Sequence, residues 1–190
     1  MSLYEGILAL MFAIALLQSG SGTASDEVSV FEFDRDSAAD WVVVNDGVMG
    51  GVSSSAFVDS DSGYATFRGE LSLDNNGGFA SVRGEIQEGM LAGRSVLVLR
   101  VRGDGRTYQV RFRTDGRFDG VAYRAEFATR ADEWLTVTVP MSDFEPTFRG
   151  RRPRGAPPLD VSVIQQIGLL LADYEEGPFR LDVAWIRAAG

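Results

Sequence analysis

Short runs of apolar, β-branched and aromatic residues, separated by Gly, Asn, Asp and Pro, repeat along the chain from Val28 onward. Several runs alternate between apolar and polar positions, which is the period of a strand with one buried face. No long segment repeats apolar residues at helical spacing. The runs predict strands over 28–33, 41–44, 64–73, 79–85, 95–102, 107–114, 121–128, 134–140, 166–172 and 178–188. Short strands with turn signals between them indicate an all-β sandwich or barrel, with short helices only.

Two segments depart from this pattern. "LDVSVIQQ" (159–166) is a short helix candidate with Asp160 as its N-cap. "RGRRPRGAPP" (149–158) contains four arginines and three prolines, so it cannot be a central strand. This segment is predicted to be an exposed loop, which is either only solvated or contacts an anion or a partner.

The clearest two-faced pattern lies in the predicted strands 95–102 and 107–114, which "GDGR" would join as a hairpin. Their apolar positions point to the core, and the opposite face then carries Gln109 with four arginines: Arg100, Arg102, Arg111 and Arg113. Such a patch needs either carboxylates from neighbouring strands, such as Glu85 or Glu126, or an anionic or sugar ligand. An ion-pair ladder and a binding surface both remain open.

The first 25 residues differ from the rest of the chain. "ILALMFAIALL" (7–17) is uncharged and apolar, but it is shorter than the roughly 20 residues that span a bilayer. Small residues follow it, as after the apolar core of a signal peptide. The sequence therefore predicts a leader over 1–25 and one domain over 26–190, in a protein exported to the periplasm or the outside. No Arg or Lys precedes the run, which leaves a cytoplasmic or membrane-associated protein as the alternative.

Composition removes several kinds of chemistry. The chain has no His, no Cys and no Lys, and all 18 cations are arginines. Catalytic Ser-His-Asp sets, thiol nucleophiles, His/Cys metal sites and Schiff-base lysines are thereby excluded. A glycosidase could use two carboxylates, but no pair stands out among 27 acidic residues. Asp34, Asp36 and Asp40 could help to bind a calcium ion, as oxygen ligands on loops do, but no ordered EF-hand spacing supports this alternative. We expect no enzyme, no cofactor and no metal site.

The formal net charge is −9, which argues against nucleic-acid binding by the domain as a whole. The most unusual stretch is "WVVVNDGVMGGVSSSAF" (41–57), in which Asn45, Asp46 and Gly47 form a turn signal. Gly50 and Gly51 allow close backbone approach, and Met49 is either an adaptable partner contact or part of a packed loop. A second turn, "DNNGG" (74–78) with Asn75 and Asn76, is its predicted companion. Together they are the first candidate for recognition.

"WVVVNDGVMGG" (41–51) resembles the signature of the complex I intermediate-associated protein 30 family. Later blocks resemble that family in the same order over about residues 28–188, and they are "FRGELSLDNNGGFASVR" (67–83), "YQVRFRTDGRFDGVAYRAEF" (108–127), "WLTVTVPMSDFEPTFRGR" (134–151) and "IQQIGLLLADYEEGPFRLDVAWI" (164–186). The resemblance implies a galactose-binding-domain-like jelly-roll β-sandwich without catalytic activity. Mitochondrial members of the family assist assembly of respiratory complex I as chaperone-like factors.

On this basis the chain is predicted to be a binding or assembly-factor domain that engages a protein partner. The resemblance suggests a membrane complex or a respiratory complex as that partner. The alternative is a carbohydrate-binding module of an exported protein, whose partner is a glycan. A fold does not fix a function, so the two remain distinct hypotheses.

Overall fold

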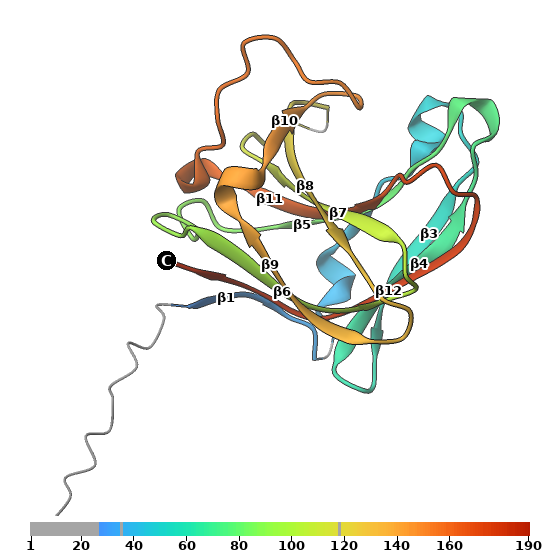
Figure 1. Cartoon of the computed structure of the whole chain (residues 1–190), viewed down its shortest axis with the longest axis horizontal. Helices are drawn as coiled ribbons and strands as arrows, with labels where there is room; N and C mark the ends of the chain where they lie inside the picture. Colours follow the sequence, from blue (N-terminus) through green and yellow to red (C-terminus); the bar gives the residue numbers. More distant parts are fainter. Residues whose placement is uncertain (1–26, 35, 118) are drawn as a thin grey trace, which may run out of the picture.

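The computed structural model describes residues 27–34, 36–117 and 119–190. The leader predicted over 1–25 lies outside these residues. Two six-stranded antiparallel sheets pack face to face, as Figure 1 shows. The all-β sandwich predicted from alternation is thus confirmed, and within the described part the helical elements are short 3₁₀ turns. No helix in that part is long and apolar enough to cross a membrane.

The first sheet, named sheet A here, is built around the long C-terminal strand. In spatial order it contains β3 (Ser54–Ser60), β4 (Tyr64–Leu71), β12 (Gly177–Ala189), β6 (Val96–Gly103) and β9 (Trp134–Pro140), and β1 (Val28–Glu32) also pairs with β12. The second sheet, sheet B, contains β10 (Glu145–Thr147), β8 (Ala122–Ala128), β7 (Thr107–Arg113), β11 (Gln166–Leu171), β5 (Ala80–Glu85) and β2 (Val42–Val43).

The core lies between the two sheets. Alternation along β6 and β7 turns one set of side chains inward, and these are fully buried: Leu97, Leu99, Val101, Tyr108, Val110 and Phe112. At the β2 edge of sheet B, Trp41 completes the core by packing against Phe31, Phe33 and Phe57 in edge-on and tilted contacts. This aromatic group closes the sandwich under the start of the Asn-Asp-Gly stretch.

The hairpin predicted between 95–102 and 107–114 is wrong. β6 pairs with β12 and β9 in sheet A, whereas β7 pairs with β11 and β8 in sheet B. "GDGR" is an arch that crosses from one sheet to the other. Gly103 accepts a hydrogen bond from the Asp132 amide, and a Cβ at Gly103 would lie 2.3 Å from Oγ1 of Thr129. Thr129 and Asp132 belong to the segment between β8 and β9, which also crosses from one sheet to the other. Its contacts with Gly103 therefore hold the arch in place.

Two smaller differences concern segment types, and one prediction about a loop agrees with the structure. β3 and β10 were not predicted as strands, because the serines of β3 hide its alternation and β10 has only three residues. The predicted helix over 159–166 is a single 3₁₀ turn, η5 (Val161–Val163). Asp160 does cap it, since its carboxylate accepts a hydrogen bond from the Ser162 amide at 3.0 Å. The segment 149–158 contains no strand longer than an isolated bridge between Phe148 and Arg151.

Candidate functional site

The Asn-Asp-Gly stretch folds around the carboxylate of Asp46, which is completely buried. Asp46 begins the 3₁₀ turn η2 (Asp46–Met49). One carboxylate oxygen accepts the Ser53 amide at 3.0 Å, and the other accepts the Ser53 hydroxyl at 2.5 Å. That second oxygen also accepts the amides of Gly78 at 2.7 Å and Phe79 at 3.3 Å. Asp46 therefore ties its own loop to the loop that contains "DNNGG".

Burial alone would raise the pKa of Asp46, but these hydrogen bonds outweigh it and lower the pKa below its usual range. The carboxylate is therefore ionised and acts as an acceptor for four donors. Two glycines make room for it. A Cβ at Gly51 would lie 2.4 Å from Cγ of Asp46, and one at Gly77 would lie 2.6 Å from Oδ2. The Asp46 side chain is thus part of the framework and does not face solvent as a ligand-binding group would, and Gly51 makes room for it.

Asn45 adds a second link, from its own loop to the strands β3 and β5 that follow the two loops. Its side-chain oxygen accepts the Ser55 hydroxyl at 2.8 Å and the Ser81 amide at 3.2 Å. Gly50 follows η2 with φ +94°, a conformation that favours glycine. Asn75 and Asn76 lie in η3 (Asp74–Asn76), and both are exposed in left-handed conformations. Figure 1 shows η2 in cyan beside η3 in green at one end of the sandwich.

The residues between these anchors point outward. Val48, Met49 and Val52 are each more than half exposed, and Leu73 is exposed beside them on the neighbouring loop. A hydrogen bond from the Ser72 amide to the Ser53 hydroxyl oxygen at 3.0 Å holds the bases of the two loops together. Apolar side chains are therefore displayed on a backbone that is fixed from below. The sequence left two alternatives for Met49, and in the structure its side chain is exposed.

A third loop, 172–176, joins this end of the molecule and was not predicted as part of it. The Leu73 amide donates to the carboxylate of Glu176 at 2.9 Å, which connects the loop to its neighbour. Tyr174 stands at the tip with φ +64° and is 83% exposed. We name the three loops 45–53, 72–79 and 172–176 together the loop end.

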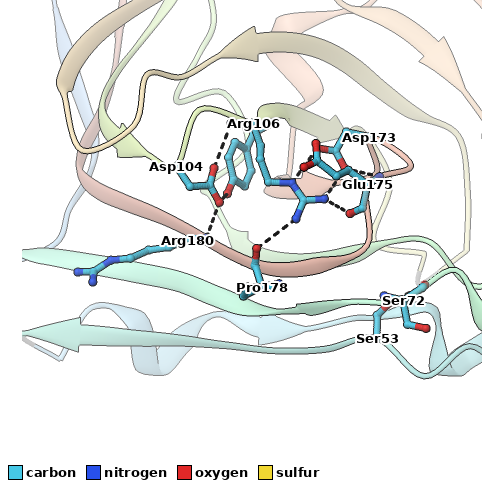
Figure 2. Close-up of polar contacts among 9 residues, drawn as sticks. Ser53, Ser72, Asp104, Arg106, Asp173, Glu175, Pro178 and Arg180 are labelled. Atoms are coloured by element: carbon cyan, nitrogen blue, oxygen red, sulfur yellow. Dashed lines mark hydrogen bonds and ion pairs between the residues drawn. The ribbon is translucent and has the colours of Figure 1, made fainter.

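Arg106, at the end of the arch, holds the third loop in place, as Figure 2 shows. Its guanidinium donates to both carboxylate oxygens of Asp173, at 2.8 and 2.6 Å. It also donates to the carbonyls of Glu175 and Pro178. The side chain of Arg106 is only 8% exposed. Burial opposes ionisation of Asp173, but the Arg106 hydrogen bond and charge lower its pKa.

The four predicted arginines separate into two pairs on opposite outer faces, because β6 and β7 belong to different sheets. On sheet A, Arg102 donates to Oδ2 of the buried Asp182 at 2.9 and 2.7 Å. Arg180 donates to the other oxygen of Asp182 at 3.0 Å. Arg100 bonds the Thr136 hydroxyl at 3.1 Å and lies over the Trp134 ring. On this sheet the ion-pair interpretation is correct, although the carboxylate is neither Glu85 nor Glu126.

On sheet B the other pair forms no such ladder. Arg111 donates twice to the side-chain oxygen of Gln109, at 3.0 and 2.7 Å, and Arg113 donates to the Gly120 carbonyl at 3.1 Å. Neither forms a salt bridge within the described residues. Glu126 instead lies 3.4 Å from Arg124.

Sequence reasoning missed Arg83, which joins the sheet B pair. Gly168 lies opposite both Arg83 and Arg111 in the strand register, so its missing side chain leaves a shallow depression between them. Burial, followed by repulsion from neighbouring guanidiniums, lowers the pKa of Arg83 and of Arg111 to about 10. We name Arg83, Arg111, Arg113 and Gly168 the arginine face. Arg83 occupies an outward position of a predicted strand, but the strand pairing that brings it here was not visible in the sequence.

The arginine face continues into a larger cleft at the β2 edge of sheet B. Arg83 and Gln166 line both the depression and the cleft, which has a volume of about 840 Å³. Its other walls include four acidic side chains: Glu32, Asp36, Asp40 and Glu85. Within the described residues, no group of three or more acidic side chains is placed to hold a metal ion. Asp34, Asp36 and Asp40 therefore do not form such a group.

Comparison with known proteins adds a family and a fold. A family model described as complex I intermediate-associated protein 30 matches residues 31–183. The mouse mitochondrial complex I intermediate-associated protein 30 is 36% identical over 96 residues, which cover 48% of this chain and 29% of that protein. The probable Caenorhabditis elegans counterpart is 28% identical over 155 residues, or 72% of this chain and 46% of that protein. The chain thus spans less than half the length of these relatives.

Among solved structures, the chain resembles a family 11 carbohydrate-binding module from Clostridium thermocellum, solved with a β-1,3-1,4-mixed-linked tetrasaccharide. The TM-score is 0.65 at 17% identity, over 86% of this chain and 95% of that one. At this identity the likeness establishes the shared β-sandwich fold alone.

Proposed function

Because the chain belongs to the complex I intermediate-associated protein 30 family, we propose that it is a non-catalytic binding domain of the assembly-factor type, which engages a protein partner through the loop end. The observation that carries this proposal is the pairing of exposed apolar side chains with a rigid base. Val48, Met49 and Val52 project from a loop whose backbone is fixed by Asp46. Preordered apolar contacts lose little conformational entropy on association.

The loop end also indicates the chemistry of the partner. Exposed methionine and tyrosine side chains are common at the centres of protein interfaces, and here Met49 and Tyr174 provide both. Acidic side chains lie around them, namely Asp74, Glu175 and Glu176. The proposed partner therefore presents apolar side chains next to Arg or Lys, because this arrangement complements both components of the loop end.

Site-directed photo-crosslinking tests this proposal. A photoreactive benzoyl-phenylalanine replaces Val48 in one variant and Thr138, on β9 of sheet A, in the control. We expect one defined partner to be crosslinked from position 48 and not from position 138, and to bind the purified chain directly. The double variant Val48→Ser/Met49→Ser should then lose binding at least about tenfold without a change in melting temperature. Equal crosslinking from both positions, or full binding by the double variant, would refute the loop end as the docking surface.

A second candidate function is carbohydrate binding, as part of an exported protein. The cleft of about 840 Å³ beside sheet B favours it, because its volume is in the range of small-molecule sites and its lining is rich in polar groups. Export itself is a proposal that rests on the apolar run 7–17 and the small residues after it. Mass spectrometry of the protein from its native host tests it: a mature N-terminus near Ser25 or Asp26 supports export, and an intact Met1 or Ser2 in a soluble cytoplasmic fraction refutes it.

A further inference from the structure

Two polar atoms in residues that line the cleft at the β2 edge of sheet B have no hydrogen-bond partner within the described residues. They are Nε1 of Trp41 and Oε1 of Gln166, and both are covered by protein. Trp41 as a whole is only 6% exposed. A covered polar group without a partner raises the energy of the fold, and most such groups in proteins are paired. The cleft therefore has one N–H donor and one carbonyl acceptor that the fold itself leaves unsatisfied.

The position of Trp41 depends on the strand next to it. A Cβ at Gly84 in β5 would lie 2.6 Å from Cε2 and 2.8 Å from Nε1 of the indole. Any larger residue at position 84 would therefore displace the edge of the ring that carries the nitrogen. Phe31 packs edge-on against the same ring, with the ring centres 5.0 Å apart. A phenylalanine at position 41 could supply similar aromatic packing without an unpaired donor, so packing alone does not account for an N–H group here.

Hydroxyl groups fit this pair of atoms, because a hydroxyl can accept from the indole N–H and can also donate to the Gln166 carbonyl. The described walls of the cleft carry four carboxylates and one guanidinium, that of Arg83. Carboxylates accept hydrogen bonds from hydroxyls, but they repel an anionic ligand. The chemistry of the lining thus favours a neutral ligand with many hydroxyl groups.

The size and shape of the cleft favour a sugar chain over a peptide. Its volume of about 840 Å³ is in the range of ligand sites and can hold a short oligosaccharide. Trp41 packs against Phe31, Phe33 and Phe57, so it can contribute its N–H but no open ring face for stacking. An extended peptide is a weaker fit, because β2 has only two residues with which an added strand could pair.

We propose that this cleft binds a neutral oligosaccharide through hydrogen bonds, in which one sugar hydroxyl accepts from Nε1 of Trp41 and another donates to Oε1 of Gln166. Glu85, which lies opposite Gln166 in the strand register, accepts a further hydroxyl. The inference rests on the second proposed function, carbohydrate binding, and adds the charge class of the glycan and two residues that recognise it. Because both atoms are covered in the free chain, their side chains have to shift slightly as the ligand enters.

Calorimetric titration with a panel of tetrasaccharides tests the ligand class. The neutral probes are cellotetraose, xylotetraose and mannotetraose, and the acidic probe is tetragalacturonate. We expect at least one neutral probe to bind with a Kd of about 1 mM or lower. The acidic probe should bind at least about tenfold more weakly than that neutral probe, because its carboxylates would lie against the acidic walls.

Two variants at one position connect that binding to Gln166. Gln166→Leu should weaken binding of the neutral probe at least about threefold, whereas Gln166→Glu retains an acceptor and should bind within about twofold of the original chain. The melting temperature of Gln166→Leu should not fall, because the substitution removes an acceptor that the fold leaves unpaired. Gln87→Leu, at an exposed position outside the cleft lining, is the matched control and should bind as the unmodified chain does. Full binding by Gln166→Leu would refute the proposed contact.

A spectroscopic measurement reports on Trp41 without a change in the core. The chain has three tryptophans, and the other two, Trp134 and Trp185, lie in β9 and β12 of sheet A. In proton–nitrogen correlation spectra, the neutral probe should move the indole N–H signal of Trp41 downfield, as a new hydrogen bond does, and leave the other two signals in place. The Trp41→Phe variant assigns the signal. A Trp41 signal that stays in place at saturation would refute its contact with the sugar.

The remaining outcomes separate the inference from the function beneath it. Binding of tetragalacturonate as tight as that of every neutral probe, or tighter, would overturn the inference and leave carbohydrate binding intact. If none of the four probes binds, the inference is refuted, and carbohydrate binding falls as well if a wider set of glycans also fails. Binding of a tetra-alanine peptide with the same dependence on Gln166, in place of the sugars, would show that the ligand is a peptide.

Discussion

The carboxylate of Asp46 lies 2.7 Å from the backbone amide of Gly78, although the two residues are 32 positions apart in the chain. This contact joins two loops that belong to different strand connections. The same oxygen holds the Ser53 hydroxyl, so a single buried charge determines the positions of three backbone segments. The apolar residues displayed at the loop end therefore depend on a group that never reaches solvent.

Replacement of Asp46 by Asn should lower the free energy of unfolding by about 2–3 kcal/mol, because an amide is a weaker acceptor and brings its own N–H donors into a site already filled by donors. Urea denaturation measures the change. Asp61→Asn, at the exposed tip between β3 and β4, is the control and should change the stability by less than about 0.5 kcal/mol. Equal effects of the two substitutions would contradict the anchoring role of Asp46.

Asp46 also predicts a pH dependence. Its pKa is lowered on folding from an ordinary value of 3.8, so the folded state holds the ionised form more favourably than the unfolded state does. The resulting stability is fully present above the unfolded pKa and is lost as the pH falls through the folded pKa. Between pH 5 and pH 3 the original chain should therefore lose more stability than Asp46→Asn does. Parallel loss in both proteins would assign the acid sensitivity to other carboxylates.

Gly77→Ala should destabilise the chain by about 1–3 kcal/mol, since the added methyl group would lie 2.6 Å from the Asp46 carboxylate and 2.9 Å from the Asp74 carbonyl. Gly47→Ala is the matched control in the partner loop, because a Cβ at that position meets nothing within 4 Å. Differential scanning calorimetry compares the two variants. A Gly77→Ala variant as stable as Gly47→Ala would show that the packing around Asp46 is loose.

Local sequence patterns predicted much of the fold. Alternation along β6 and β7 correctly placed residues such as Leu99 and Val110 in the core. It could not say whether the two strands pair in one sheet or face each other from two sheets, because inward positions are the same in either arrangement. That ambiguity produced the incorrect single patch of four arginines. The outward face of a strand acquires its neighbours from pairing, and pairing depends on contacts distant in sequence.

The loop end shows the same limit. Turn signals identified Asn45–Gly51 and 74–78 as two special loops, since Asn, Asp and Gly adopt the required conformations locally. Tyr174 was missed, because its position depends on Arg106, which lies far away in the sequence and clamps Asp173. "ADYEEG" contains a turn signal of its own, but nothing in it points to an arginine on the arch between β6 and β7.

Arg106→Lys should loosen the third loop, because an ammonium group cannot make two parallel bonds to Asp173 and also reach the carbonyls of Glu175 and Pro178. We expect a loss of about 1.5–3 kcal/mol in stability and faster amide hydrogen exchange across 173–177. Arg130→Lys is the control: its ion pair with Glu133 is exposed, so the loss should stay below about 1 kcal/mol. Unchanged exchange in the loop would show that Arg106 does not hold it.

Arg111→Gln should leave the free energy of unfolding unchanged or raise it by about 1 kcal/mol, although the residue is largely covered. Burial and the neighbouring arginines lower the pKa of Arg111 to about 10, which means that its charge is held at a cost in the folded chain. Glutamine removes the charge and retains part of the apolar stem.

Arg102→Gln, in contrast, removes a partner of the buried Asp182 and should lower the stability by about 3 kcal/mol. Urea denaturation of both variants at low and high salt gives the comparison: added salt should stabilise the original chain more than Arg111→Gln, because it screens a repulsion that the variant lacks. A large loss of stability in Arg111→Gln would mean that its charge is satisfied within the fold, and the arginine face would then be structural in origin.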